Sequence, residues 1–395
     1  MPPEPQSSSR TPTHPSALFV TTVPVTLEAF LAPFAEHFRA TGWRVDALAN
    51  GAAEEPRIAE AFDDRFDVSW SRDPLDWRNI SGPAARVREV VDAGGYDLVH
   101  VHTPIAAFTA RYALRKRLRG GRPAVLYTAH GFHFYEGGSA AGNLLYSRME
   151  RLAAPWTDYL VTINAEDYAA ARELGGIDPG RVRLIPGIGV DLARYGEGVV
   201  DAAEAAAVRD ELDVPAGAFM LTMVAEMAPV KRHAFALDAL ARVRDPRVVL
   251  VLVGVGPLES SLREKATALG LDERIRWAGY RRDVPAVLAA SDALLLCSQR
   301  EGLNRSALEA MASGTPVIGT DTRGIADAVA QGTGWISDKD DPAALAAAID
   351  EAASDPDEVR RRGQAARRRA EAEYALPHII DAYEELYREA LASRV

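Results

Sequence analysis

Residues 293–320 read ALLLCSQREGLNRSALEAMASGTPVIGT, and this stretch decides the fold. Two apolar runs, Ala293–Cys297 and Pro316–Gly319, enclose a polar turn and a segment with helical spacing. Apolar runs without alternation are typical of parallel strands that are buried on both faces. A strand, a helix and a second strand in this order predict one unit of a parallel α/β sheet.

Eleven such apolar runs alternate with helical segments between about residues 17 and 335. Because eleven strands exceed what one open sheet comfortably holds, we expect an α/β protein with two doubly wound, Rossmann-like domains. The predicted strands are Ala17–Thr21, Val45–Ala49, Asp97–Val101, Val125–Ala129, Tyr159–Ile163, Val182–Ile185, Met220–Val224, Val248–Val253, Ile275–Trp277, Ala293–Cys297 and Pro316–Gly319.

The boundary between the two domains is expected near Pro186–Tyr195. Gly187 and Gly189 interrupt the strand pattern there, and a polar, Ala-rich stretch follows. We therefore expect an N-terminal domain at residues 17–190 and a C-terminal domain at residues 191–375.

The two ends of the chain are expected to differ in structure. Residues 1–16 are rich in Pro, Ser and Thr and lack an apolar stretch, which predicts a disordered tail rather than a signal peptide. The last helix, expected at residues 376–395, carries one apolar stripe at helical spacing. Such a stripe must pack against another part of the protein.

The composition excludes several classes of protein. A chain with 48% hydrophobic and 26% charged residues is neither disordered throughout nor collagen-like. The net charge of −11 argues against nucleic acid as the main partner. The single cysteine, Cys297, excludes a disulfide framework and fits a reducing compartment. No apolar run approaches the ~20 residues that span a membrane, so we expect a cytoplasmic protein, with peripheral contact at the inner face of the membrane.

The turn and helix inside the quoted stretch form the first candidate site. Gly302 permits a tight turn, and Asn304 can cap the helix, so the N–H groups of Leu303–Ala307 would face an anion in the crevice at the strand ends. Glu301 and Glu309 beside this anion site suit the hydroxyl groups of a sugar and a ribose. The alternative is a capped helix with one exposed and one ion-paired glutamate.

Two further candidates follow other predicted strands. Lys231 comes shortly after Met220–Val224, where a lysine can reach a phosphate as a point charge; Arg232 lies beside it, and the alternative is a solvated loop lysine. His130 follows Val125–Ala129 and precedes several aromatic residues, which suits sugar binding. The alternative is a buried core histidine with packing aromatics.

Other site classes are not supported by the sequence. His100 and His102 alternate on one strand, but a third metal ligand at convincing spacing is absent, so no metal site is expected. Gly254 and Gly256 follow a strand but lack the third glycine and the acidic residue of a dinucleotide fingerprint. A dinucleotide-dependent dehydrogenase is therefore not expected.

In their order along the chain, these motifs resemble the family-4 retaining glycosyltransferases of the GT-B fold, in the bacterial branch that builds exopolysaccharide and lipopolysaccharide. The resemblance covers residues 17 to about 390 and implies two Rossmann-like domains facing a cleft, with the C-terminal helix crossing back to the first domain. It also implies that the N-terminal domain is the acceptor-side domain and that the C-terminal domain is the nucleotide-sugar-binding domain. It rests on the motifs LFVTTV, DLVHVHTP, YTAHGFHFY, VTINAEDY, RLIPGIGVD, VLVGVGPLESSL, WAGYRRDVP and REGLNRSALEAMASGTPVIGT, together with Lys231.

The resemblance implies a role for each candidate residue. Glu309 would bind the ribose of the nucleotide, Glu301 would hold the hydroxyls of the donor sugar, and His130 would lie at the reaction centre. Lys231 would neutralise the diphosphate. The remaining donor-binding residues would be Gly254, the Tyr280–Asp283 turn against the base, and the backbone of Leu303, Asn304, Arg305 and Ser306 around the β-phosphate.

The chain departs from the family pattern at two places. Glu226 stands where the family usually has an arginine, five residues before the lysine, and Arg232 is expected to compensate. The glycine-rich turn that the family has after the first strand is missing, since Thr22, Val23 and Pro24 follow that strand here.

The predicted function is transfer of a hexose or N-acetylhexosamine from a nucleotide sugar, expected to be UDP-linked, to a hydroxyl acceptor such as a polyprenyl-linked saccharide. The nucleotide sugar is a substrate, and neither a cofactor nor a metal is expected. Three alternatives stay open: the same chemistry on a soluble secondary metabolite, a GT-B sugar-nucleotide epimerase, and an inactive sugar-nucleotide-binding protein.

A basic stretch suggests where a membrane could be contacted. Residues 111–122 read RYALRKRLRGGR, with six basic residues and no acidic one. Basic amphipathic helices bind anionic lipid surfaces. We expect peripheral membrane contact through this stretch, and the alternative is a solvated helix face.

Overall fold

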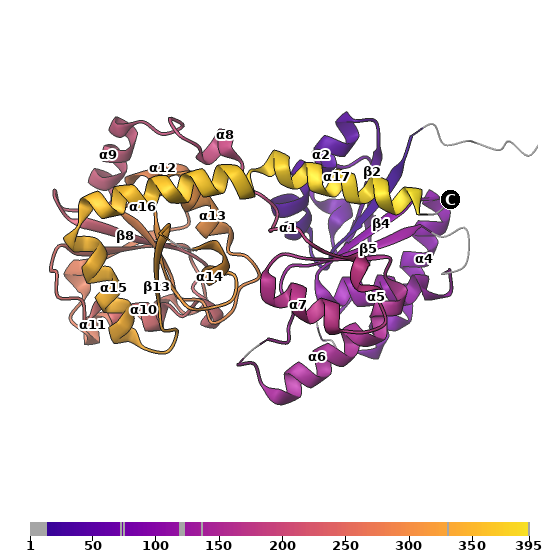
Figure 1. Cartoon of the computed structure of the whole chain (residues 1–395), viewed down its shortest axis with the longest axis horizontal. Coiled ribbons are helices and arrows are strands. Elements are labelled where there is room, and N and C mark those ends of the chain that lie inside the picture. The colour runs from indigo at the N-terminus through magenta and orange to yellow at the C-terminus, as the bar shows by residue number, and fades with distance from the viewer. Residues whose placement is uncertain are drawn as a thin grey trace, which may run out of the picture.

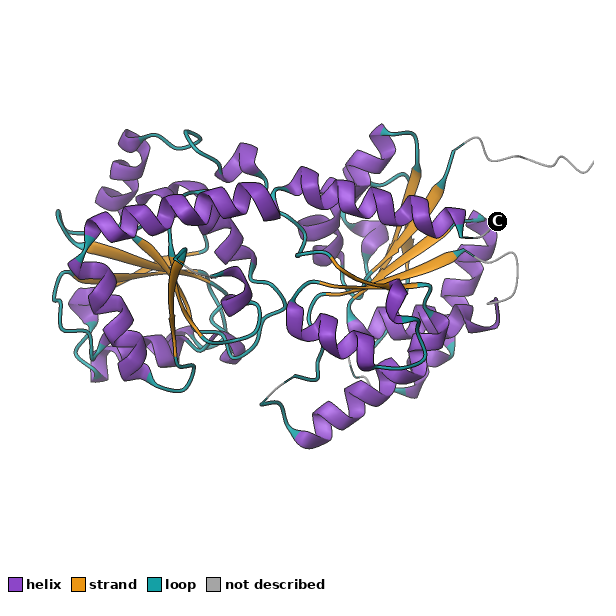
Figure 2. Cartoon of the chain, viewed as in Figure 1, coloured by secondary structure: helices purple, strands orange, loops and turns teal. Residues whose placement is uncertain are grey.

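A computed structural model describes residues 14–71, 73, 76–117, 123–135, 137–329 and 332–393. Two parallel sheets carry helices on both faces and lie side by side along the long axis of the molecule (Figures 1 and 2). The first sheet has the order β3-β2-β1-β4-β5-β6-β7. Its strands are β1 Ser16–Val20, β2 Arg44–Ala49, β3 Arg65–Asp67, β4 Leu98–His102, β5 Ala124–Ala129, β6 Tyr159–Thr162 and β7 Val182–Leu184.

The second sheet has the order β10-β9-β8-β11-β12-β13. The chain order reverses between β8 and β11, and this switch point places a ligand crevice at the carboxyl ends of these strands. Its strands are β8 Phe219–Val224, β9 Val248–Val253, β10 Ile275–Gly279, β11 Ala293–Leu296, β12 Val317–Thr320 and β13 Gly334–Ser337.

All eleven predicted strands are present, and two strands were missed. β3 (Arg65–Asp67) and β13 (Gly334–Ser337) are short edge strands with three and four residues. An edge strand needs no continuous apolar run, because one of its sides has no strand neighbour, and neither segment shows the aliphatic pattern of the central strands. The expected tail also ends too late, because Ser16 already belongs to β1. Residues 1–13 of that tail lie outside the described part of the chain.

The helices cover both faces of each sheet (Figure 2). In the first domain they are α1 Pro24–Thr26, α2 Ala32–Ala40, α3 Pro56–Ala61, α4 Gly82–Gly94, α5 Pro104–Leu114, α6 Ala140–Ala153 and α7 Ala165–Glu173. A π-helical turn, Leu27–Leu31, joins α1 to α2. The helices that follow are α8 Leu192–Tyr195, α9 Ala202–Glu211, α10 His233–Leu240, α11 Glu259–Ala268, α12 Val284–Ala290, α13 Arg305–Ala312, α14 Ile325–Ala328, α15 Pro342–Ser354, α16 Pro356–Arg369 and α17 Leu376–Ala392.

The last helix returns to the first domain, as expected. α17, yellow in Figure 1, buries its apolar stripe in the core that β1, β2 and α2 form, where the rings of Phe38 and Tyr387 stack with centroids 4.7 Å apart. The chain crosses between the domains twice, and the two crossings are hydrogen-bonded to each other. Val190 N donates to Tyr374 O (2.8 Å), and Leu376 N donates to Val190 O (2.9 Å).

Part of the basic stretch at residues 111–122 points into the protein, whereas Lys116 is exposed, and membrane contact through the rest of the stretch stays a prediction. Arg111 is only 1% exposed, and its Nη2 atom lies 2.8 Å from Oε2 of Glu150. Leu114 is buried, and Tyr112 packs against Trp156 within the protein. Arg111 can be buried because Glu150 on α6 supplies a partner for its guanidinium. Residues 118–122 lie outside the described part.

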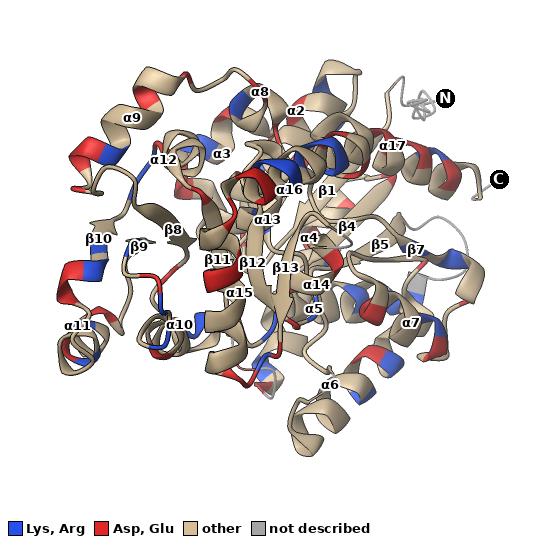
Figure 3. Ribbon diagram, turned by 60° about the vertical axis from the view of Figure 1, so that its left-hand side comes forward, with Lys and Arg blue, Asp and Glu red and all other residues tan. Residues whose placement is uncertain are grey.

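Charged residues of both signs occur on helices of both domains (Figure 3). Within the described residues, no helix is both long enough and apolar enough to cross a membrane.

Candidate active site

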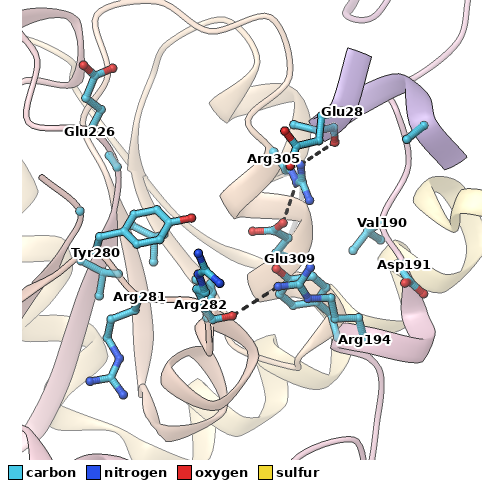
Figure 4. Close-up of a pocket in the computed structure, with 18 of the residues that line it drawn as sticks. Glu28, Val190, Asp191, Arg194, Glu226, Tyr280, Arg281, Arg282, Arg305 and Glu309 are labelled. Carbon is cyan, nitrogen blue, oxygen red and sulfur yellow. Dashed lines mark hydrogen bonds and ion pairs between the residues drawn. The ribbon is translucent and has the colours of Figure 1, made fainter. Parts of the chain in front are cut away.

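A cavity of about 1130 Å³ lies between the two domains at the carboxyl ends of β8 and β9. The first domain contributes Glu28, Ala29 and Arg57 to its wall. The second domain contributes Gly254, Tyr280 and α13 residues (Figure 4). A cavity of this size at a topological switch point is the expected place for a substrate.

Glu309 reaches the cavity from the second turn of α13. Asn304 caps this helix, since its Oδ1 accepts a hydrogen bond from Ala307 N at 3.0 Å, which confirms the predicted cap. Glu309 lies 2.7 Å from Nε of Arg305, and Figure 4 shows the two side chains pointing toward each other. Only 9% of its side chain is exposed, and the ion pair with Arg305 orients this carboxylate.

Arg305 connects Glu309 to the first domain. Its Nη1 atom donates to the carbonyl oxygen of Ala29 at 2.8 Å. Tyr195 on α8 closes the same wall, and burial, followed by the charge of Glu309, raises the pKa of its phenol. The hydroxyl of Tyr195 therefore stays protonated at neutral pH and can act as a hydrogen-bond donor.

Lys231 and Glu301 form an ion pair, with Nζ and Oε1 2.6 Å apart. Both follow neighbouring strands, β8 and β11, and Gln299 N donates to Val230 O between the two loops (2.8 Å). Neither side chain lines the large cavity. Lys231 is therefore balanced by Glu301 here, and the pair lies at the strand ends, one turn before α13.

His130 lies against the turn that carries Glu301. A Cβ atom at Gly302 would clash with the carbonyl oxygen of His130, so the two main chains are in close contact. The imidazole of His130 does not line the large cavity, because its Nε2 faces Nδ1 of His102 at 3.0 Å. The structure thus places the backbone of His130 beside the candidate sugar site and its ring toward the interior.

Three neighbouring histidines form a largely buried row beneath this point: His100 and His102 are buried, and His130 is partly buried. His100 contacts Thr128 Oγ1 through Nε2 (2.8 Å) and the hydroxyl of Tyr387 through Nδ1. Burial lowers the pKa of His130 to about 4, and burial together with the neighbouring His130 lowers the pKa of His100 to about 3. Burial also lowers the pKa of His102 well below its ordinary value. All three rings are therefore neutral at pH 7.

Of the other predicted donor-binding residues, some line the cavity and others lie outside it. Tyr280 lines the cavity and is 73% exposed. Ser306 Oγ donates to Val224 O at 3.1 Å, which fixes α13 to β8. The side chain of Leu303 packs against Gly187, so among residues 303–306 only Arg305 lines the cavity.

Arg232 does not replace the arginine that Glu226 has displaced. Glu226 lines the cavity, whereas Arg232 donates to Lys339 O (2.6 Å) and lies 3.5 Å from Asp340. The cavity therefore has an acidic side chain where a cation was expected, and Arg232 stabilises a neighbouring loop.

Several cavity residues were not predicted. They come from the turn before α2 and from α8: Glu28, Ala29, Asp191, Arg194 and Tyr195. Arg194 Nη2 donates to Arg282 O at 3.4 Å across the opening. The sequence could have indicated Asp191–Tyr195 by one signal: these residues directly follow the glycines of the domain boundary. Glu28 and Ala29 carry no local signal.

Comparison with known proteins now assigns the family. Residues 27–194 match the family model Glycosyltransferase Family 4, and residues 205–369 match the model Glycosyl transferases group 1. EpsD of Bacillus subtilis (strain 168), named as a glycosyltransferase, is 34% identical over 356 residues, which cover 89% of this chain and 91% of EpsD. The chain belongs to glycosyltransferase family 4.

A further relative and a solved structure are also similar to this chain. The Escherichia coli UDP-Gal:alpha-D-GlcNAc-diphosphoundecaprenol alpha-1,3-galactosyltransferase is 30% identical over 235 residues, 58% of this chain and 59% of that protein. The structure of Anabaena Alr3699/HepE in complex with UDP and glucose has a TM-score of 0.78 at 21% identity, and the match covers 95% of this chain and 100% of HepE. The fold is therefore GT-B, and this family-4 member is a glycosyltransferase.

No group of three or more His, Cys, Asp or Glu side chains is arranged to hold a metal ion within the described ranges. Cys297 is free and buried, and burial raises the pKa of its thiol to about 12. The thiol is therefore not a nucleophile at neutral pH.

Proposed function

We propose that this glycosyltransferase moves a hexosyl or N-acetylhexosaminyl group from a UDP-sugar to a hydroxyl acceptor with retention of the anomeric configuration. The observation that carries the proposal is the fixed carboxylate of Glu309 in an interdomain cavity, beside the N-terminus of α13. A carboxylate there accepts hydrogen bonds from ribose hydroxyls. The helix N-terminus favours the negative charge of the diphosphate.

In the proposed reaction, the bond between the sugar C1 and the diphosphate oxygen breaks, and a bond from C1 to the acceptor oxygen forms on the same face. The proton of the acceptor hydroxyl passes to the leaving UDP. Charge develops on that leaving group, so positive groups held nearby lower the barrier. We assign this charge to the N–H groups at the start of α13 and to Lys231 at the end of β8, which is released from its ion pair when Glu301 turns to the sugar hydroxyls; the step invokes no metal.

The names of two similar proteins support the choice of UDP as the base and of a hexose as the sugar of the donor. The Escherichia coli relative is named for UDP-Gal, and HepE is titled as a complex with UDP and glucose. A thermal-shift panel of UDP, GDP and ADP tests the base. Release of UDP from UDP-glucose, UDP-galactose and UDP-N-acetylglucosamine then tests the sugar. A melting shift with GDP or ADP but none with UDP would contradict the proposal.

The proposed acceptor is a saccharide linked to a polyprenyl diphosphate at the membrane surface. The support is the acceptor named for the Escherichia coli relative. We expect UDP release to accelerate with a diphosphoundecaprenyl saccharide and the protein to float with anionic liposomes. Acceleration by free saccharides alone, without liposome binding, would favour a soluble acceptor.

A second candidate, a sugar-nucleotide-binding protein without transferase activity, is favoured by one observation. Glu226 places a negative charge in the cavity where the donor diphosphate is expected. UDP binding without UDP-sugar turnover, restored in Glu226→Arg, would support this candidate.

A further inference from the structure

Arg323 lies in the loop after β12 and is buried between the two domains, with 6% of its side chain exposed. Its Nη1 atom lies 2.7 Å from Oδ1 of Asp167 on α7, and its Nη2 atom donates to Phe132 O at 3.0 Å. Both partners belong to the first domain. Its Nε atom donates to Glu301 O in its own domain at 3.1 Å. One guanidinium thus connects three segments, and one of them is the turn that carries the candidate sugar-binding carboxylate.

The first domain holds its side of this contact rigidly. Asp167 is 1% exposed, and its Oδ2 accepts hydrogen bonds from Phe132 N (3.0 Å) and Asn164 Nδ2 (2.8 Å). Asn164 Nδ2 also donates to Gly302 O at 3.0 Å. The carbonyls of Glu301 and Gly302 are therefore both held, one by Arg323 and the other by Asn164.

The main chains approach closely at the same point. A Cβ atom at Gly131 would lie 3.1 Å from Gly302 Cα, and one at Gly302 would clash with His130 O. Two glycines allow the His130 loop and the Glu301 turn to touch, and Arg323 is the charged group that spans this contact. Buried pairs of this kind are costly to break, because the remaining partner is left as an uncompensated charge.

We propose that Arg323 is a positioning residue for sugar transfer. It holds the Glu301 turn against the His130 loop, so that the donor-sugar site keeps a fixed position relative to the first domain. Arg323 acts through Glu301 and does not itself contact the nucleotide. This inference rests on the proposed function, in which Glu301 binds the donor sugar.

Two variants of the full chain, Arg323→Met and Asp167→Asn, test the proposal. We expect both to raise the radius of gyration in X-ray scattering, because the interdomain contact is lost. Turnover of the UDP-sugar that the wild type uses should fall about ten- to a hundredfold, since small misplacements of a reacting group have effects of this size. UDP affinity should stay within about twofold, because Arg323 lies outside the donor cavity.

The matched control is Arg209→Met. Arg209 pairs with Asp292 at 3.3 Å and donates to the carbonyl of Ala290 (2.7 Å), with both partners in its own domain. We expect this variant to keep the wild-type radius of gyration and turnover. If Arg323→Met folds poorly, Asp167→Asn still tests the contact with the changes expected above, and Arg323→Lys should give partial opening with a partial loss of turnover.

Wild-type values of both the radius of gyration and turnover in Arg323→Met and Asp167→Asn would overturn the inference. So would a loss of UDP affinity equal to the loss of turnover, because that pattern indicates general damage to the donor site. If the wild-type protein binds no UDP, the proposed function fails, while the scattering comparison still decides whether Arg323 holds the domains together.

Discussion

Arg305 Nε and Glu309 Oε1 lie 2.7 Å apart across one turn of α13, and the same guanidinium donates to Ala29 O in the other domain. The carboxylate that we assign to the nucleotide ribose is therefore oriented by a residue that also contacts the opposite wall of the cavity. Arg305 thus contacts both the carboxylate of Glu309 and the first-domain wall of the cavity.

Glu301→Ala should reduce turnover more than it reduces UDP affinity. Glu301 is assigned to the sugar hydroxyls and does not line the cavity that contains Glu309. A hydrogen bond to a charged group contributes about 1.5–3 kcal/mol, so turnover should fall about ten- to a hundredfold, while UDP affinity should change little. Rates of UDP release and calorimetric titration with UDP measure the two quantities. Parallel losses in both would place Glu301 at the nucleotide instead.

Transfer should be independent of divalent metal. In the proposed function, the N–H groups of α13 and Lys231, once Glu301 has turned to the donor sugar, supply the positive charge that a metal would otherwise provide. UDP release should therefore be the same with EDTA as with Mg²⁺ or Mn²⁺. Activity that EDTA abolishes and a metal restores would show that this assignment of the charge is incorrect.

Stability should decrease as the pH falls from about 6.5 towards 4. His100 and His130 have folded-state pKa values of about 3 and about 4, below the ordinary value of 6.5, because burial disfavours their charged forms. Between the folded and unfolded pKa values, the unfolded chain binds more protons than the folded chain. The free energy of unfolding is therefore highest above the unfolded pKa and decreases as the pH falls towards the folded pKa. Each such group contributes a slope of up to about 1.4 kcal/mol per pH unit.

Urea denaturation at pH 7 and pH 5 measures this effect. The loss of stability between the two values should be smaller in His130→Gln than in the wild type. His37→Gln, which replaces a histidine outside the buried row, should keep the wild-type loss. Equal losses in all three proteins would mean that the buried row is not the source of the pH dependence.

The sequence predicted the parts of the fold that local pattern determines. Aliphatic runs identified the central strands, and the turn, cap and helix around Asn304 were found because they lie within a few residues of one another. The ion pair of Arg111 with Glu150 could not be predicted from local pattern, because the two residues are 39 positions apart. Arg111 was therefore assigned to an exposed basic face, although its partner buries it.

The same limitation applies to the candidate site. Arg323 and Asp167 are 156 residues apart, and Arg305 and Ala29 are 276 apart, so each contact exists only after both domains have folded and met. The family resemblance identified residues in the second domain because their motif is local. The contribution of the first domain to the cavity, from Glu28, Ala29 and Arg57, has no such motif.

Arg111→Met should destabilise the protein by about 3–5 kcal/mol, because it leaves the buried carboxylate of Glu150 without its cation. Lys116→Gln, at an exposed position of the same basic stretch, should change stability little. Chemical denaturation of both variants measures the difference. Equal stability would indicate that Arg111 is accessible to solvent in solution.

Calorimetric titration with UDP tests the central claim most directly, on the wild type, Glu309→Ala and Glu373→Ala. Glu373 is the matched control, since it lies four residues after its partner Arg369, as Glu309 does after Arg305, and pairs with it at 3.0 Å outside the cavity. Loss of a charge-assisted hydrogen bond should weaken UDP binding by Glu309→Ala about ten- to a hundredfold, while Glu373→Ala should bind like the wild type. Unchanged UDP affinity in Glu309→Ala, or no UDP binding by the wild type, would contradict the account.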